Sequence, residues 1–179
     1  MDKLTPEDIR VERLTKEHII SNFQSCEKEL VNFLVEDASS NQENKISVTY
    51  LIFLKNTNEL VGYVTLLNDR INLEGNLKET FRKKGVEYSS LPALKIGRLC
   101  VDDKFLRKGI GTMMIDFSIK VAFYIFRDYS GCRFIVLEAK KHENNNTLHF
   151  YKKLGFKQLK DRKKGTIPMY FDLINNFKV

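Results

Sequence analysis

The chain has 179 residues, of which 42% are apolar and 30% charged, the composition of an ordinary globular protein. No apolar run is long enough to span a membrane and the first residues lack the apolar core of a signal peptide, so we expect a single cytoplasmic domain over residues 1–179. Three scattered cysteines and three histidines without ligand spacing argue against a disulfide frame and a zinc site, and the net charge of +7 suits either a polyanionic partner or a lysine-rich surface.

Residue patterns in the first half of the chain predict a strand, two helices and a hairpin. Residues 7–13 alternate apolar and charged side chains, as a half-buried strand does, and Thr15 is a plausible cap for a helix directly after it. A second helix is expected after Ser25, where apolar residues recur at helical spacing up to residue 38. Residues 48–54 and 60–67 are rich in β-forming residues and flank a polar turn, which predicts a hairpin.

The second half of the chain predicts a strand, a long helix and another strand in succession. After a connector with a short helix over 76–84, strands are expected over 93–101 and 132–139, with a helix from Ile110 to about Asp128 between them. A connection of this kind is right-handed and joins parallel strands. A helix over 144–154 and an antiparallel pair over 156–159 and 167–173 complete an α/β protein, whose mixed sheet has helices on its faces.

The junction between the strand predicted over 93–101 and the long helix indicates an anion site. An apolar strand ends near Val101, a short charged loop follows, and the helix begins at the glycine pair Gly109 and Gly111. The first amides of a helix have no partners within it, and the helix dipole favours negative charge there. Arg107 and Lys108 add positive charge, so a diphosphate-bearing ligand is the first hypothesis, although turn geometry alone would also explain the glycines.

Two motifs in the second half of the chain resemble those of the GNAT superfamily of N-acetyltransferases. Residues 106–111 match the acyl-CoA loop Gln/Arg-x-x-Gly-x-Gly/Ala, with Leu106 in place of the Gln or Arg. Residues 144–156 match the helix motif Asn-x-x-Ala-x-x-x-Tyr-x-x-x-Gly-Phe, with Thr147 in place of the Ala. The resemblance covers about residues 9–173. It implies a mainly antiparallel sheet of six to seven strands with helices on both faces, and acetyl-CoA as the donor without a metal.

A narrower likeness concerns the acceptor of the acetyl group. Residues 23–34 and 97–101 look like the opening and the Gly-Arg-Leu-Ala-Val strand of a GNAT toxin branch, except that Glu27 replaces a glycine. Members of that branch acetylate the amino group of aminoacyl-tRNA and are encoded beside a ribbon-helix-helix antitoxin. The acceptor remains open between a small amine, a protein and aminoacyl-tRNA. An antitoxin partner, a homodimer and a domain that binds acyl-CoA without turnover also remain open.

The same resemblance implies a set of donor-binding residues. Main-chain groups of Leu99, Cys100 and Val101 would bind the pantetheine arm, and the amide of Val101 or its neighbour would polarise the thioester carbonyl. The pyrophosphate would be held by Arg107, Lys108, Gly109, Ile110, Gly111 and Thr112. Asn144 would bind the cofactor or orient a water, although helix capping also explains it. For Cys100, a buried strand thiol is a better interpretation than a covalent nucleophile.

Proton transfer and acceptor binding fall on other residues. Tyr151 is the predicted general acid, because the thiolate of coenzyme A leaves poorly without a proton; the alternative is a core aromatic, for which Phe150 is the more natural candidate. The base is either Glu138 or a chain of waters, and Glu138 could equally be an ion-pair partner. Arg98 is predicted to contact the acceptor. A phosphate track or a merely solvated surface would explain the basic run Lys152, Lys153, Lys157, Lys160, Arg162, Lys163 and Lys164.

Overall fold

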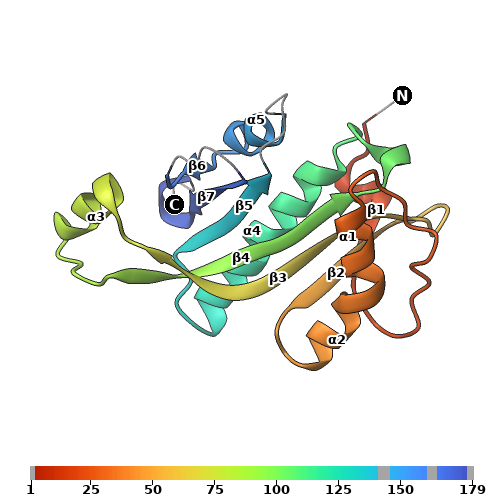
Figure 1. Ribbon diagram of the computed structural model, residues 1–179, viewed down its shortest axis with the longest axis horizontal. Coiled ribbons are helices and arrows are strands. Elements are labelled where there is room, and N and C mark those ends of the chain that lie inside the picture. Colours follow the sequence, from red (N-terminus) through yellow and green to blue (C-terminus); the bar gives the residue numbers. More distant parts are fainter. Residues whose placement is uncertain (1–2, 141–145, 161–164, 177–179) are drawn as a thin grey trace. The chain divides into compact units, whose positions relative to one another are not determined.

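The computed structural model describes residues 3–140, 146–160 and 165–176, and Figure 1 shows the course of the chain. The chain divides into two compact units. Unit 1 consists of Met1–Leu67 and Ile96–Ser118, and unit 2 of Asn68–Lys95 and Ile119–Val179.

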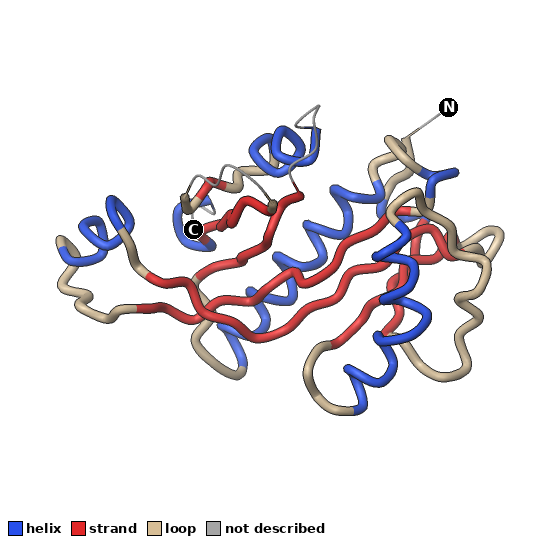
Figure 2. Tube along the Cα trace, in the orientation of Figure 1, coloured by secondary structure: helices blue, strands red, loops and turns tan. Residues whose placement is uncertain are grey.

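Within the described residues, seven strands are hydrogen-bonded in the order β1-β2-β3-β4-β5-β7-β6. Figure 2 colours the strands red in the orientation of Figure 1, which labels them. Their bounds are β1 Ile9–Arg13, β2 Val48–Leu54, β3 Leu60–Asn72, β4 Ser90–Val101, β5 Phe134–Lys140, β6 Lys157–Gln158 and β7 Thr166–Asp172. The pairs β1–β2, β2–β3, β5–β7 and β6–β7 are antiparallel. This arrangement confirms the predicted α/β class, the central hairpin and the final antiparallel pair.

The helix predicted after Ser25 is present in unit 1 as three consecutive pieces. These are α1 Lys28–Asn32, the π-helical turn η2 Phe33–Asp37 and α2 Ala38–Glu43. Glu27 occupies the N-cap position, and the Ser25 hydroxyl instead accepts a hydrogen bond from the Glu27 backbone N–H at 3.3 Å. The predicted helix is therefore confirmed, while its N-cap, Glu27, lies two positions beyond the predicted cap, Ser25.

The prediction of a helix starting at Thr15 is wrong, because the chain forms turns and irregular structure between β1 and α1. The His18 ring nitrogen Nδ1 lies 3.0 Å from the Thr15 backbone nitrogen and 2.9 Å from the Thr15 hydroxyl, which closes a single turn. Ile19 is then 77% exposed, whereas Leu14 and Phe23 are buried beside α1 and β2. Since the buried residues are not at helical spacing, a continued helix would have no face to bury.

Helices cover both faces of the unit 1 strands. On one face, Tyr63 of β3 packs against Phe23 and Phe33, and its hydroxyl donates to the Leu30 carbonyl at 2.7 Å. On the other face lies the long helix α4, Ile110–Asp128, which confirms its predicted bounds. There the ring of Tyr50 meets that of Phe117, with the centroids 4.8 Å apart.

Gly62 allows α4 to approach β3 closely. A Cβ at this position would lie 3.1 Å from the Cys100 carbonyl oxygen, 3.1 Å from Ile110 Cγ2 and 3.4 Å from Met114 Cε. We expect Gly62→Ala to lower the free energy of unfolding by about 1–2 kcal/mol, because a backbone oxygen cannot yield as a flexible side chain can. Chemical denaturation measures this. Gly131→Ala, whose Cβ would meet only Pro92 at an ordinary 3.5 Å, is the control, and an equal loss in both variants would contradict the explanation.

Unit 2 contains the helices α3 Gly75–Arg82, α5 Asn146–Lys153 and α6 Leu173–Asn176. The short connector helix and the helix before Gly155 were predicted, whereas α6 was not. In the β5–β7 pair Val136 lies opposite Tyr170, and Phe134 forms edge-on ring contacts with Phe81 and Tyr170. These aromatic contacts build a core that belongs to unit 2.

Candidate active site

The predicted donor loop of unit 1 starts where β4 ends and is held by Asp102. This residue is buried, and its backbone N–H donates to the Val61 carbonyl at 3.0 Å. Its carboxylate accepts from the backbone N–H groups of Gln24 at 2.9 Å and Lys104 at 3.0 Å. The second bond caps the short 3₁₀ turn η3, Asp103–Phe105. Asp102 therefore fastens the loop to the segment before α1, a role that the sequence patterns did not reveal.

The turn into α4 has a left-handed backbone at two residues, with φ of +62° at Arg107 and +93° at Gly109. Only glycine adopts the second conformation without strain, so Gly109 is required by backbone geometry. The carbonyl of Lys108 between them accepts a hydrogen bond from the Leu4 backbone N–H at 3.0 Å. The N-terminal segment of the chain thus helps to fix the loop.

Residues 110–112 form the first turn of α4, where main-chain amides can receive an anion. The first amides of a helix lack intrahelical partners and the dipole is positive there, so the amides of Ile110, Gly111 and Thr112 suit a phosphate. The Ile110 side chain is buried, so only the backbone amide of this residue could contact an anion. Leu106, at the Gln or Arg position of the resembled motif, is exposed.

The two cations of the loop differ in their surroundings. Arg107 is exposed, whereas the Lys108 ammonium lies 4.7 Å from the centroid of the Phe105 ring. Phe105 is buried and its backbone N–H donates to the Asp102 carbonyl at 2.8 Å. Lys108 therefore lies against a buried aromatic ring, and Arg107 is the more exposed of the two cations.

The strand residues Leu99, Cys100 and Val101 close this part of the site. Leu99 and Val101 are half-buried, whereas Cys100 is buried and its thiol lies 3.8 Å from the Val101 carbonyl. Burial raises the pKa of the Cys100 thiol to about 11, only partly offset by a hydrogen bond with Ser25. A thiol with this pKa is almost entirely protonated at neutral pH, which supports the interpretation of Cys100 as a structural residue.

Thiol labelling tests this interpretation. Cys26 is exposed, whereas Cys100 and Cys132 are buried with pKa values raised mainly by burial. We therefore expect iodoacetamide at pH 8 to modify one thiol per native chain within minutes, and mass spectrometry of peptides to place it at Cys26. Cys26→Ser removes the fast phase. Rapid labelling of Cys100 in that variant would contradict the assignment.

Arg98, the predicted acceptor residue, lies on β4 in unit 1. Its guanidinium carbon is 5.1 Å from the centroid of the Phe33 ring, and one terminal nitrogen donates to the Gly97 carbonyl at 2.8 Å. Its Nε atom is buried, and among the described residues it has no hydrogen-bond partner. A buried donor without a partner is costly, so the Arg98 Nε needs an acceptor that the described protein atoms do not supply.

Tyr151, the predicted general acid, lies on α5 in unit 2 and is 8% exposed. Its ring makes edge-on contacts with Phe150 and Phe156, with centroids 5.1 and 5.6 Å away. Phe150 is only half-buried, so the expectation that Phe150 is the more natural core residue was wrong. Burial raises the pKa of Tyr151 to about 12, which keeps its hydroxyl protonated at neutral pH.

Glu138, the candidate base, is an exposed residue of β5 in unit 2. Its carboxylate accepts a hydrogen bond from the Thr166 hydroxyl at 2.6 Å. It lines a pocket of about 170 Å³ together with Asp69, Lys95 and Lys160. Asp69 and Lys95 form an ion pair at 3.4 Å, so the carboxylate lies among charged side chains.

Some predicted residues lie outside the described part of the chain. Asn144 is one of them, as are Arg162, Lys163 and Lys164 of the basic run. Lys152, Lys153, Lys157 and Lys160 are described and exposed. Lys160 forms an ion pair with Glu74 of the same unit at 3.6 Å, so part of this run is neutralised locally.

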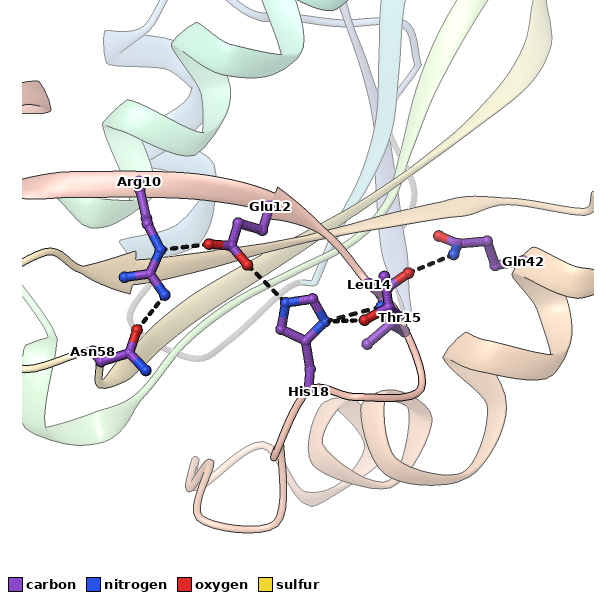
Figure 3. Close-up of polar contacts among 7 residues, drawn as sticks. All are labelled: Arg10, Glu12, Leu14, Thr15, His18, Gln42 and Asn58. Atoms are coloured by element: carbon purple, nitrogen blue, oxygen red, sulfur yellow. Dashed lines mark hydrogen bonds and ion pairs between the residues drawn. The ribbon is translucent and has the colours of Figure 1, made fainter.

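A polar pocket of about 1100 Å³ in unit 1 was not anticipated from the sequence. Figure 3 shows the network on its wall, in which Glu12 accepts from Arg10 at 2.5 Å and pairs with His18 Nε2 at 2.8 Å. Arg10 also bonds Asn58, and its guanidinium lies 4.8 Å from the Phe53 ring centroid. The hydrogen bonds from His18 and Arg10 lower the pKa of Glu12, so this carboxylate remains ionised at a lower pH than an ordinary glutamate does.

No helix among the described residues is long and apolar enough to cross a lipid bilayer. Within the same residues, no group of three or more His, Cys, Asp or Glu side chains could hold a metal ion.

Most of the chain, including most of the candidate site residues, matches the model of a known protein family. A family model described as Acetyltransferase (GNAT) family matches residues 15–156. The matched range includes β4, the donor loop, α4 and the residue Tyr151 of α5.

Three solved structures are similar to the chain along nearly its whole length, each at 22% sequence identity. A point mutant of KacT covers 94% of this chain and 96% of its own, with a TM-score of 0.78. AtaT complexed with acetyl-methionyl-tRNAfMet covers 90% and 94%, with a TM-score of 0.75. A mutant AtaT toxin bound to the C-terminus of the antitoxin AtaR and acetyl-CoA covers 94% and 95%, with a TM-score of 0.70. At this identity the likeness establishes a shared fold.

Proposed function

Because the chain belongs to the acetyltransferase (GNAT) family, we propose that it transfers the acetyl group of acetyl-CoA to the primary amine of an aminoacyl-tRNA. Residues 1–179 are proposed to act as one catalytic domain. The observation that carries the donor half of the proposal is the loop before α4. Gly109 holds a left-handed turn there, and the helix amides that follow are suited to a pyrophosphate.

Donor binding is assigned to unit 1. The amides of residues 109–112 hold the pyrophosphate, assisted by Arg107 and Lys108, and main-chain groups of residues 99–101 hold the pantetheine arm. An amide at Val101 polarises the thioester carbonyl. Leu106 offers no polar group, so main-chain amides carry more of the binding than in the resembled motif. Asn144 is assigned to the donor or to a bound water.

The reaction is proposed as a direct attack. The amine nitrogen forms a bond to the acetyl carbon, the carbon–sulfur bond breaks, and the amine loses one proton to a base. Tyr151 gives its proton to the departing thiolate and is reprotonated from solvent; burial raises its pKa to about 12, so the hydroxyl carries that proton at neutral pH. The base is proposed to be a chain of waters, with Glu138 as the second candidate. The protonated thiol of Cys100 supports transfer without a covalent enzyme intermediate.

The choice of acceptor draws on charge and on fold. By sequence, unit 2 has nineteen Lys and Arg residues against nine Asp and Glu, a net charge of +10, while unit 1 has a net charge of −3. Such a basic surface attracts a phosphate backbone. AtaT, which shares the fold, has been complexed with an acetylated aminoacyl-tRNA, and Arg98 offers a buried N–H to an acceptor group.

The proposed partner is an antitoxin of the ribbon-helix-helix class. The support is that AtaT has been solved with the C-terminus of its antitoxin AtaR and with acetyl-CoA. A small ribbon-helix-helix protein encoded next to this chain, and its recovery in a complex after co-expression, would support the assignment. A complex that does not form between the two purified proteins would contradict it.

An acetyl-transfer assay tests donor and acceptor separately. With labelled acetyl-CoA and charged tRNA, we expect the label in the aminoacyl-tRNA fraction and an acetyl-CoA-dependent arrest of cell-free translation. Label in polyamines or peptides alone would overturn the tRNA acceptor and leave the donor assignment intact. No thermal stabilisation at saturating acetyl-CoA would overturn the donor assignment, because a ligand that binds the native state must stabilise it.

A further inference from the structure

The turn into α4 presents four main-chain amides that the protein itself does not use. Among the residues that the structure describes, the backbone N–H groups of residues 109–112 have no hydrogen-bond partner. The first bond into the helix runs from the Met113 N–H to the Gly109 carbonyl at 3.1 Å. The proposed function gives these amides to the donor's pyrophosphate, and Leu106 adds no polar side chain there. The direction in which each amide points therefore decides how well the donor is held.

The first of these amides belongs to the peptide bond between Lys108 and Gly109. The carbonyl and the N–H of a trans peptide point in opposite directions, and no peptide bond in the described ranges is cis. The Lys108 carbonyl accepts the Leu4 backbone N–H at 3.0 Å, and Figure 1 shows the beginning of the chain beside the loop before α4. The Gly109 N–H must therefore point away from Leu4 and toward the other side of the turn.

The backbone of this turn alternates in handedness. The angle φ is +62° at Arg107 and +93° at Gly109, whereas Lys108 between them is not left-handed. Successive residues of opposite handedness turn their N–H groups toward one point, which makes a concavity that binds anions. A left-handed arginine is strained and persists only where the surrounding structure holds it. The bond from Leu4 to Lys108 supplies such a restraint in the middle of the turn.

Gly109 makes this restraint necessary. Glycine adopts positive and negative φ about equally well, so the peptide between Lys108 and Gly109 could rotate at little steric cost. A half-turn would direct the Lys108 carbonyl oxygen, in place of the Gly109 N–H, at the negatively charged pyrophosphate. Leu4 also lies close to Gly109 itself, because a Cβ there would be 3.5 Å from the Leu4 carbonyl oxygen. The first residues of the chain thus oppose this rotation.

The segment that carries Leu4 is itself fixed to the sheet. It continues into the 3₁₀ turn η1, Pro6–Asp8. The Thr5 N–H and hydroxyl both donate to the Asp8 carboxylate at 2.8 Å. The Asp8 carbonyl accepts the Lys55 N–H at 2.9 Å, directly before β1. Leu4 is therefore held firmly enough to orient the group that it bonds.

We propose that Leu4 is a positioning residue for the donor, whose N–H keeps the peptide between Lys108 and Gly109 in the orientation that directs the Gly109 amide at the pyrophosphate of acetyl-CoA. The proposal rests on the donor assignment made above. It concerns one main-chain hydrogen bond, so the Leu4 side chain is not required. The pantetheine arm is assigned to residues 99–101 of β4, which the bond does not touch. The effect should therefore be confined to donors that carry the pyrophosphate.

Two substitutions at one position separate the N–H from the side chain. Leu4→Pro removes the N–H, whereas Leu4→Ala keeps it. By calorimetry, we expect Leu4→Pro to raise the dissociation constant of acetyl-CoA about tenfold and Leu4→Ala to change it less than about twofold. Lys3→Pro is the matched control, because the Lys3 N–H has no backbone acceptor in the part of the chain that the structure describes. Its affinity for acetyl-CoA should equal that of the wild type.

A donor without phosphates distinguishes positioning from general distortion. S-acetylpantetheine contains the thioester and the pantetheine arm but lacks the pyrophosphate. In titrations followed by NMR, Leu4→Pro should bind it as the wild type does. Equal weakening of both donors would overturn the proposal, as would unchanged affinity of folded Leu4→Pro for acetyl-CoA. Circular dichroism melting curves establish that each variant is folded.

NMR of the wild-type chain tests the same bond without a substitution. The Leu4 amide should exchange with deuterium at least tenfold more slowly than the Lys3 amide, and saturating acetyl-CoA should shift the Gly109 amide resonance. Equal exchange of the two amides, or an unshifted Gly109 resonance, would overturn the proposal and leave the donor assignment intact. A wild-type chain that does not bind acetyl-CoA would overturn both.

Discussion

Replacing Tyr151 with Phe is expected to lower kcat by about 10²–10⁴-fold, the usual contribution of a general acid. The substitution keeps the ring contacts with Phe150 and Phe156 and removes the hydroxyl alone. The affinity for acetyl-CoA, measured by calorimetry, and the melting temperature should therefore change little. Because burial raises the pKa of Tyr151 to about 12, the wild-type rate should not fall through deprotonation of this residue up to pH 10.

Tyr170→Phe is the matched control for this substitution. Tyr170 is also in unit 2, packs edge-on against Phe134, and has a pKa raised mainly by burial. It has no proposed part in the reaction, so its variant should retain wild-type kcat. Equal rates in wild type and Tyr151→Phe would remove Tyr151 from the mechanism and leave it as a core aromatic.

Asp102→Ala is expected to lower the free energy of unfolding by about 2–4 kcal/mol and to weaken acetyl-CoA binding about tenfold. The reason is that two backbone N–H groups, of Gln24 and Lys104, lose their buried acceptor, at about 1–3 kcal/mol each. The loop that leads to the helix amides then loses its tie to the segment before α1. Denaturant titration and calorimetry with acetyl-CoA measure the two effects.

The neighbouring Asp103→Ala supplies the comparison. Asp103 is exposed and contributes its backbone N–H to the Gln24 carbonyl, a bond that the substitution keeps. Its variant should have wild-type stability within about 0.5 kcal/mol. If Asp102→Ala were as stable as Asp103→Ala, the carboxylate would not be the anchor of the loop.

The elements that periodicity predicted well are those stabilised by their own pattern. The 19-residue helix α4 has apolar residues at helical spacing, and the β2–β3 hairpin consists of two runs of β-forming residues around a short polar turn. Thr15 is a typical helix N-cap residue, but the residues after it have no apolar face to bury. The contacts of His18 with Thr15 close a single turn there in place of a helix. An N-cap residue therefore predicts a helix only where the residues that follow it have an apolar face that packs against the rest of the protein.

The candidate site was predictable where chemistry follows from adjacent residues. The glycine pair marked the start of α4 and its anion site because both features are local. The tie between Asp102 and Gln24 spans 78 positions, and the close contact at Gly62 joins β3 to Ile110, so no spacing pattern contains them. The burial of Tyr151 beyond that of Phe150 is likewise a result of packing between α5 and residues after it.

The hydrogen bond between Leu4 and Lys108 has a consequence for how this protein can vary and be engineered. It makes Leu4 a structural part of the loop before α4, although 104 positions separate Leu4 from Lys108 in sequence. Insertions or deletions near the N-terminus would shift the register of that bond, so they are less tolerated than their surface position suggests. A purification tag joined at this end should be followed by a flexible linker, so that residue 4 keeps its place.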